Sequence, residues 1–148
     1  MMKKRIIIIS CGGTGGHIFP GIEIAQTIKK KDSNTHIVFV GALGKMEMQK
    51  IPKNGFPIIG LYIQAFYRKS IIKNLLFPIK LIISLIHAFF ILIYYRPVAI
   101  IGTGGFASFP IVFIGSLLKY KTYIQEQNSF AGLSNKILSK YVDKIFVA

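Results

Sequence analysis

A glycine-rich segment that directly follows a run of isoleucines constrains the fold of this chain most strongly. Residues 6–9 are all isoleucine, and residues 12–17 read GGTGGH. An unbroken apolar run of this kind is typical of a parallel strand that is buried on both faces. Glycines after such a strand let the backbone approach a ligand closely, and the start of a following helix favours bound anions. The segment predicts a strand–loop–helix unit that binds phosphate or another oxyanion, with a tight turn that binds nothing as the alternative.

The chain alternates throughout between short β-branched runs and longer segments of helical periodicity. This alternation predicts an α/β fold, a Rossmann-like parallel sheet with helices on both faces. Functional loops in such sheets follow the carboxyl ends of the strands, near the point where the strand order reverses. Residues 62–73, which are basic and aromatic, are expected to form an exposed loop. The predicted strands are 5–10, 36–40, 57–61, 98–101, 122–125 and 144–147, and the predicted helices are 18–31, 45–51, 71–95, 108–120 and 132–141.

Composition excludes several classes of protein. The 148 residues suffice for one domain, and 52% hydrophobic against 16% charged residues excludes intrinsic disorder. Cys11 is the single cysteine, which excludes a disulfide framework, and together with three scattered histidines it provides no zinc site. The net charge of +14 favours anionic partners such as phosphates or anionic lipid. We expect no metal and no cofactor. We also expect no nucleic-acid partner, because no nucleic-acid-binding motif accompanies this charge.

One apolar segment raises the question of a membrane span. Residues 81–95 carry no formal charge, but a spanning helix needs roughly 18 or more apolar residues. Extending the run to that length would include Lys80 and Pro78. We therefore expect a buried or interfacial helix, and a protein that meets the membrane peripherally rather than through a span.

A second glycine segment, residues 102–107 (GTGGFA), also follows a predicted strand. It fits the dinucleotide-binding pattern G-x-G-x-x-G/A, and Glu126 lies about 20 residues further on. That pattern normally follows the first strand, whose own loop has Ile18 where the third glycine would stand. A turn that only brings a helix close to the sheet is the other interpretation. A small nucleotide- or NAD-binding protein therefore remains an alternative.

A third candidate segment is polar and follows the fifth predicted strand. Residues 125–129 read QEQNS, and residues 131–136 read AGLSNK. Asn128 can donate and accept hydrogen bonds, which suits a sugar hydroxyl or an amide, and Glu126 could accept a proton or a hydroxyl hydrogen bond. Because all three segments follow strands of one parallel sheet, we expect them to converge at the same edge.

These three segments together resemble the MurG family of glycosyltransferases. The resemblance rests on residues 12–21 (GGTGGHIFPG), 102–106 (GTGGF), 126–128 (EQN) and 131–136 (AGLSNK), and it runs from Arg5 to Ala148. It implies the GT-B arrangement of two Rossmann-like domains, of which residues 1–148 resemble the amino-terminal, acceptor- and membrane-binding domain alone. The carboxy-terminal donor domain would be absent from this chain, which we therefore expect to be inactive in isolation.

The family resemblance implies a reaction. An inverting enzyme transfers N-acetylglucosamine from UDP-N-acetylglucosamine to the C4 hydroxyl of lipid I, an undecaprenyl-pyrophosphoryl-muramyl peptide, and so makes lipid II for peptidoglycan. By its position in the first motif His17 would be the catalytic base, since an imidazole can accept a proton near neutral pH. No Asp-x-Asp pair for a metal–diphosphate site occurs in the sequence. Gln125 departs from the family, where a His commonly precedes the Glu-Gln-Asn motif.

Further site residues follow from the resemblance. The donor-binding residues would be Thr14, Gly15, Gly16 and Asn128. The acceptor-binding residues would be Gly104, Gly105, Phe106, Glu126 and Gln127. A membrane patch of apolar side chains with basic neighbours would comprise Lys73, Leu75, Leu76, Phe77, Ile79, Lys80 and Lys140.

The implied partners are the two substrates, an anionic membrane surface at the cytoplasmic face of the bacterial inner membrane, and a separate carboxy-terminal half. Besides the nucleotide-binding alternative, the third interpretation is a basic membrane-binding module without catalytic activity, which applies if no such half exists.

Overall fold

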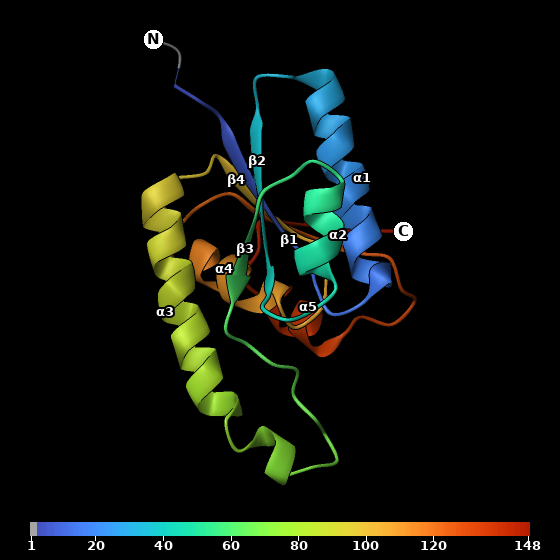
Figure 1. Cartoon of the computed structure of the whole chain (residues 1–148), viewed down its shortest axis with the longest axis vertical. Coiled ribbons are helices and arrows are strands. Elements are labelled where there is room, and N and C mark those ends of the chain that lie inside the picture. The colour runs from blue at the N-terminus through green and yellow to red at the C-terminus, as the bar shows by residue number, and fades with distance from the viewer. Residues whose placement is uncertain (1–2) are drawn as a thin grey trace.

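The computed structural model describes residues 3–148 and contains one sheet of six parallel strands in the order β3-β2-β1-β4-β5-β6 (Figure 1). All six predicted strands are confirmed, with ends that differ by one or two residues. Their bounds are β1 Ile6–Ser10, β2 His36–Ala42, β3 Ile58–Leu61, β4 Ala99–Gly102, β5 Thr122–Glu126 and β6 Lys144–Val147.

Helices follow the first five strands, as the sequence predicts. They are α1 Gly15–Lys31, α2 Glu47–Lys53, α3 Phe77–Tyr95, α4 Ser108–Leu117 and α5 Leu133–Leu138, with a short 3-10 helix, η1, at Ile72–Asn74. The prediction of one continuous helix over 71–95 is wrong at its start. Pro78 has no N–H, and its ring would clash with the carbonyl of Asn74 in a continuous α-helix, so α3 begins at Phe77.

Side chains alternate between two apolar clusters, one on each face of the sheet. Ile8 belongs to a cluster that includes Ala88 of α3 and Ile111 of α4. Its neighbour Ile9 belongs to a second cluster with Ile22 of α1 and Ile51 of α2. The predicted covering of both faces is therefore present around the central strands. The last strand, β6, is different because all four of its residues are exposed.

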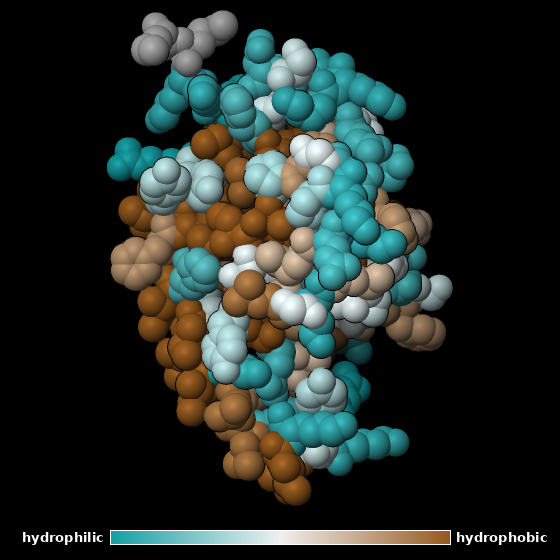
Figure 2. All heavy atoms as spheres, in the orientation of Figure 1, coloured by the Kyte–Doolittle hydropathy of each residue, from teal (hydrophilic) through white to brown (hydrophobic). Residues whose placement is uncertain are grey.

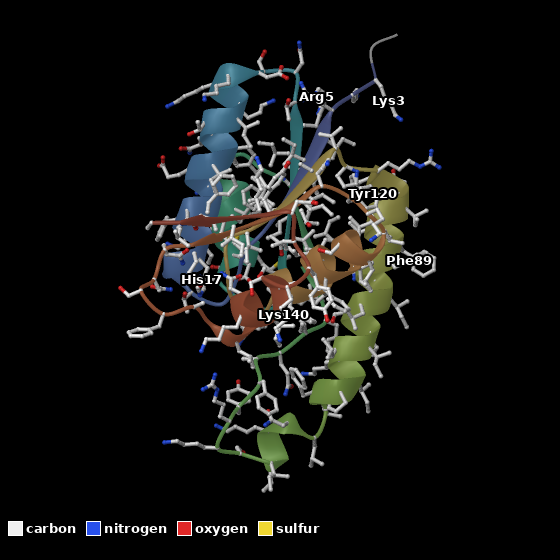
Figure 3. The ribbon with its side chains drawn as sticks, turned by 180° about the vertical axis from the view of Figure 1, so that it is seen from behind. Lys3, Arg5, His17, Phe89, Tyr120 and Lys140 are labelled. Carbon is white, nitrogen blue, oxygen red and sulfur yellow. The ribbon has the colours of Figure 1, made fainter. Side chains whose placement is uncertain are left out.

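Helix α3 is mostly apolar, with Lys80, Ser84 and His87 as exceptions, but it is buried on one side only. Its buried residues recur at helical spacing, and Tyr120 donates a hydrogen bond from its hydroxyl to the Leu92 carbonyl (3.1 Å) on that side. Phe89 projects away from the domain (Figure 3). The outer face forms a brown band along one edge of Figure 2, and its exposed residues include Ile79, Ile82, Ile83, Ile86, Phe89, Phe90, Ile93 and Tyr94.

By length and composition alone, the segment Ile72–Tyr95 is long and apolar enough to cross a membrane, with a mean hydropathy of 2.4 over its best window. The prediction that this region is too short to span a membrane is therefore wrong as far as its length is concerned. The fold supplies a different constraint. Helix α3 connects β3 to β4, two strands of one sheet, and packs against α4. A crossing would separate these strands.

The connection between β3 and α3 has no regular structure before η1, as predicted, yet it is held in place by hydrogen bonds. The Tyr67 N–H donates to Asn74 Oδ1 (2.8 Å), and Asn74 Nδ2 donates to the Tyr67 carbonyl (2.6 Å). Gln64 Nε2 donates to the Lys73 carbonyl (2.6 Å). Figure 1 shows this connection and the start of α3 extending beyond the carboxyl edge of the sheet. We call residues 62–76 the projecting segment.

Candidate functional site

The strand order reverses between β1 and β4, which lie side by side at the centre of the sheet. The loop after β1 and the loop after β4 therefore leave the sheet at neighbouring points. They contact each other directly: Thr103 Oγ1 donates a hydrogen bond of 2.6 Å to the His17 carbonyl. The convergence of the first two motifs that the sequence predicts is thus present in the structure.

His17 lies in the first turn of α1, because this helix begins at Gly15, three residues earlier than predicted. Its ring atom Nδ1 lies 3.2 Å from the Thr103 carbonyl oxygen and 2.8 Å from Gln127 Nε2. A carbonyl only accepts and an amide Nε2 only donates, so these two partners select opposite tautomers. A proton on Nδ1 bonds to Thr103 and leaves the lone pair on Nε2, whereas a lone pair on Nδ1 accepts from Gln127.

The second glycine segment packs tightly against the first. Gly104 and Gly105 have φ values of +107° and +83°. A Cβ at Gly104 would collide with the His17 ring, and one at Gly105 would collide with the Gly12 carbonyl. Close approach to the first glycine loop therefore accounts for both glycines. The same observation removes the need for a dinucleotide to explain this motif.

Gln127, which follows β5, joins the third motif to the first. Its Nε2 donates a hydrogen bond of 2.6 Å to the Gly16 carbonyl. That carbonyl would normally bond to the N–H of residue 20, but Pro20 has none. Because α1 begins at Gly15, Pro20 lies in the second turn of the helix and leaves this acceptor free.

Glu126 lies at the end of β5 and is 6% exposed. Its Oε1 accepts from the Asn128 N–H (3.0 Å), and its Oε2 accepts from Asn135 Nδ2 (2.9 Å). Desolvation by itself raises the pKa of this carboxyl, but these hydrogen bonds outweigh it, so the pKa lies below its ordinary value. Glu126 is therefore an ionised acceptor, suited to a hydroxyl or amide of a ligand. Asn135, on α5, belongs to the AGLSNK segment, but its own role in the site was missed.

Glu47 is a second missed residue, and it lies completely buried beneath the first glycine loop. Its Oε1 accepts from the Ala42 N–H (2.8 Å), and its Oε2 accepts from the Gly13 N–H (3.2 Å). A Cβ at Gly12 or Gly41 would collide with the Glu47 side chain. The glycines at these positions thus make room for a carboxylate that holds the loop. Its position in a short amphipathic helix gave no sequence signal of this role.

Cys11 is buried at the start of the same loop. Desolvation, reinforced by the nearby Glu47 charge, raises the pKa of its thiol to about 12, although a hydrogen bond with Thr103 opposes the shift. The thiol is therefore uncharged and unreactive near neutral pH. Cys11 is part of the packing around the loop and has no chemical role in the site.

The three loops border one pocket of about 570 Å³, within the range of about 300–1,000 Å³ typical of ligand sites. Its polar lining, here called the polar end, includes His17, Glu126, Asn128 and Asn135. Apolar side chains from the projecting segment, α3 and α4 also line it, and we call them the apolar end. Those side chains include Ile63, Phe66, Phe77, Leu81 and Phe109. Among residues 3–148, no group of three or more His, Cys, Asp or Glu side chains could hold a metal ion.

The predicted site residues fall into two groups. His17, Gly104, Gly105, Phe106, Glu126 and Asn128 line the pocket, and Gln127 contacts His17 and Gly16. Thr14 is exposed and caps α1 without a side-chain hydrogen bond, and Gly15 and Gly16 form the first turn.

Most of the residues predicted to form the membrane patch lie outside this pocket. Leu75, Leu76 and Ile79 are exposed, with 52–68% of each residue's surface accessible, whereas Phe77 lines the pocket. Lys73 and Lys80 lie over the rings of Tyr67 and Tyr62, with their Nζ atoms 5.2 and 4.9 Å from the ring centroids. Lys140 follows α5 and is exposed (Figure 3).

Comparison with known sequences is consistent with this geometry. Residues 7–147 match the glycosyltransferase family 28 N-terminal domain. A Flavobacterium psychrophilum protein is 49% identical over 147 residues, and an Amoebophilus asiaticus protein is 47% identical over 144 residues. Both are named UDP-N-acetylglucosamine–N-acetylmuramyl-(pentapeptide) pyrophosphoryl-undecaprenol N-acetylglucosamine transferase. The alignments cover 99% and 96% of this chain, which spans about 40% of the length of these curated relatives.

Solved structures show the same fold. The crystal structure of Acinetobacter baumannii MurG matches with a TM-score of 0.85 at 25% identity, over 97% of this chain and 41% of that one. The glycosyltransferase SnogD from Streptomyces nogalater matches with a TM-score of 0.64 at 13% identity, over 98% of this chain and 42% of that one. The second similarity is one of fold alone.

Proposed function

This chain belongs to the glycosyltransferase family 28 N-terminal domain family, and on that premise we propose that it is the acceptor-binding half of a lipid II-forming enzyme. The complete enzyme would transfer N-acetylglucosamine from UDP-N-acetylglucosamine to an undecaprenyl-pyrophosphoryl-muramyl peptide. The names of the relatives supply these substrates. Because the chain spans about 40% of their length, a carboxy-terminal half would supply most contacts to the donor.

One observation carries this proposal: His17 lies at the polar end of a pocket where the loops after β1, β4 and β5 meet. An enzyme that joins a sugar to a hydroxyl needs a base at that hydroxyl. Gly104 leaves room for the His17 ring beside the pocket, and the hydrogen bond from Thr103 Oγ1 holds the His17 backbone in place. This arrangement suits a base that receives a proton from a bound acceptor.

The chemistry would proceed by direct displacement. The acceptor's C4 oxygen attacks the anomeric carbon of the donor sugar, the bond from that carbon to the UDP oxygen breaks, and the configuration inverts. His17 Nε2 takes the proton of the hydroxyl, while Nδ1–H donates to the Thr103 carbonyl and fixes the ring. The first-turn N–H groups of α1, at Gly15 and Gly16, would bind phosphate oxygens, because they have no intrahelical acceptor. Glu126 and Asn128 would bind hydroxyl or amide groups of the sugars.

Membrane contact is the second part of the proposal. The outer face of α3 is exposed and apolar along roughly 28 Å, which extends the predicted patch well past Ile79. Three basic residues lie near it in sequence or beside the site: Lys73 in η1, Lys80 in the first turn of α3, and Lys140 just after α5. Such a surface would lie in the headgroup region of an anionic bilayer, at the cytoplasmic face of a bacterial inner membrane, and hold the pocket near a lipid-borne acceptor.

Binding measurements on the isolated chain test this assignment. A water-soluble muramyl-pentapeptide pyrophosphate should bind more tightly than inorganic pyrophosphate, because Glu126 adds a contact to the sugar or peptide. Glu126→Gln should weaken that binding by roughly tenfold, since a hydrogen bond to a charged group is lost. Glu23→Gln, at an exposed carboxyl on α1, is the matched control and should change nothing. Equal affinity for both pyrophosphates would contradict an acceptor site here.

A further inference from the structure

The apolar end of the pocket, formed by the projecting segment, α3 and α4, has no role in the proton transfer described above. Its walls come from three elements: Phe66 of the projecting segment, Phe77 and Leu81 of α3, and Phe109 of α4. None of these side chains offers a hydrogen bond. The amide of Gln64, a polar lining group at this end, is already bonded to the Lys73 carbonyl. A peptide placed here would leave its own amides unpaired, which is unfavourable in a desolvated site.

The wall is held in place independently of any ligand. The rings of Phe66 and Phe77 meet edge-to-face with their centroids 5.3 Å apart. The two hydrogen bonds between Tyr67 and Asn74 fix the segment that carries Phe66 relative to the start of α3. A rigid wall gives up little conformational entropy when a ligand binds.

The apolar end also borders the exposed apolar surface. Phe77 and Leu81, one helical turn apart, line the pocket, and Leu76 and Ile79 between and beside them are 52% and 54% exposed. A chain that leaves the pocket past Phe77 therefore meets the outer apolar residues of α3 directly. Arg68, a cationic side chain of the pocket lining, lies on the same projecting segment. It offers charge for a phosphate at this opening.

From these contacts we propose that the apolar end of the pocket binds the first isoprene units of the acceptor's polyprenyl chain, with its pyrophosphate between Arg68 and the polar end. This inference rests on the proposed function, which supplies a prenyl pyrophosphate as the acceptor. It adds that the first units leave the bilayer and are bound by protein. The site would then recognise the lipid itself as well as the sugar.

Soluble prenyl pyrophosphates give a direct test on the isolated chain without vesicles. Each buried methylene strengthens binding by up to about fourfold, so geranyl pyrophosphate should bind at least about tenfold more tightly than inorganic pyrophosphate. Phe66→Ala should remove most of that gain. The matched control is Phe146→Ala on β6, because Phe146 and Phe66 are similarly exposed, at 55% and 49%, and Phe146 does not line this pocket. Phe77→Ala is a second variant in case one replacement disturbs the projecting segment.

The outcomes separate this inference from the proposed function. Equal affinities for geranyl and inorganic pyrophosphate, or equal losses in Phe66→Ala and Phe146→Ala, would overturn the prenyl site. Tight binding of the muramyl pyrophosphate irrespective of a prenyl chain would also overturn it, while leaving the acceptor function intact. A prenyl-dependent gain without any contribution from the muramyl peptide would support the prenyl site and contradict the proposed function.

Discussion

The side-chain amide of Gln127 donates a hydrogen bond of 2.6 Å to the carbonyl oxygen of Gly16. Pro20 has no N–H for this carbonyl, so the loop after β5 satisfies an acceptor that α1 itself leaves free. The same Nε2 atom lies 2.8 Å from His17 Nδ1. Gln127 therefore both completes the first turns of α1 and supports one of the two tautomers of His17.

Replacing Gln127 with Ala should change the tautomer of His17. Only the Thr103 carbonyl would remain beside Nδ1, so the population should shift toward the form that has its proton on Nδ1. The free energy of unfolding should fall by about 1 kcal/mol, as is typical for one lost hydrogen bond. Nitrogen chemical shifts of the His17 ring report the tautomer, and urea denaturation reports the stability. An unchanged ring spectrum would show that Gln127 does not influence His17.

Replacing Glu47 with Gln should loosen the first glycine loop. A carboxylate accepts from both the Gly13 and Ala42 N–H groups, whereas an amide presents one oxygen and one donor. One buried N–H would lose its partner, which costs about 1–3 kcal/mol. Hydrogen exchange at Gly13 should accelerate.

Glu23→Gln on the exposed face of α1 is the control for this change and should leave both exchange and stability unaltered. Protection at Gly13 that survives Glu47→Gln would mean that the loop is held by other contacts.

Much of this architecture could be predicted from the sequence, because continuous apolar strands and helical periodicity reflect burial directly. The six strands and the convergence of the three loops follow from that pattern. Local chemistry shifted the ends: Pro78 delays α3, and the start of α1 at Gly15 moves Pro20 into the second turn. Such details depend on backbone geometry that periodicity does not encode.

The supporting residues of the site were harder to predict. Glu47 and Asn135 act through hydrogen bonds to positions 5 and more residues away. Glu47 stands in no glycine motif, and the AGLSNK segment alone does not indicate that Asn135 bonds to Glu126. An acidic residue in a short helix more commonly faces solvent, so burial of Glu47 becomes evident only with the sheet in place. The outer face of α3 was underestimated for a related reason. An apolar sequence does not show which side of a helix the domain leaves uncovered.

Acidification should weaken the fold through Glu126. Its pKa lies below the ordinary value of 4.5 in the folded state, so its contribution to stability is fully present above about that pH and is lost as the pH falls through the lowered pKa. Thermal unfolding of the parent and of Glu126→Gln should therefore differ most at about pH 7 and converge as the pH falls below the lowered pKa. A difference that stays constant over this range would mean that the charge of Glu126 does not stabilise the folded state.

The chain should bind membranes through charge and the outer face of α3 without spanning them. Each Lys near an anionic surface contributes about 1 kcal/mol and is screened by salt, so sedimentation with anionic vesicles should weaken as salt rises. Alkaline carbonate should release the protein, because α3 joins two strands of one sheet. The substitution Ile82→Ser, on the exposed outer face, should reduce vesicle binding. The native Ser84 lies on the buried face of α3 and should remain protected from solvent when the protein is bound.

A carbonate-resistant pellet containing a protease-protected fragment around residues 72–95 would contradict peripheral binding. In that case the length and apolar composition of this segment, rather than its packing, would decide its location.

The central claim is that His17 acts as the base of a sugar transfer for which this chain supplies the acceptor half. The direct measurement is the rate of N-acetylglucosamine transfer from UDP-N-acetylglucosamine to a lipid I analogue. The chain is assayed alone and together with the carboxy-terminal part of the Flavobacterium psychrophilum relative. We predict no transfer by the chain alone, transfer by the combined protein, and a fall of roughly 10²–10⁴ in turnover for His17→Ala with little change in donor affinity. Turnover of His17→Ala within a few-fold of the parent, or transfer by the 148 residues alone, would contradict the account.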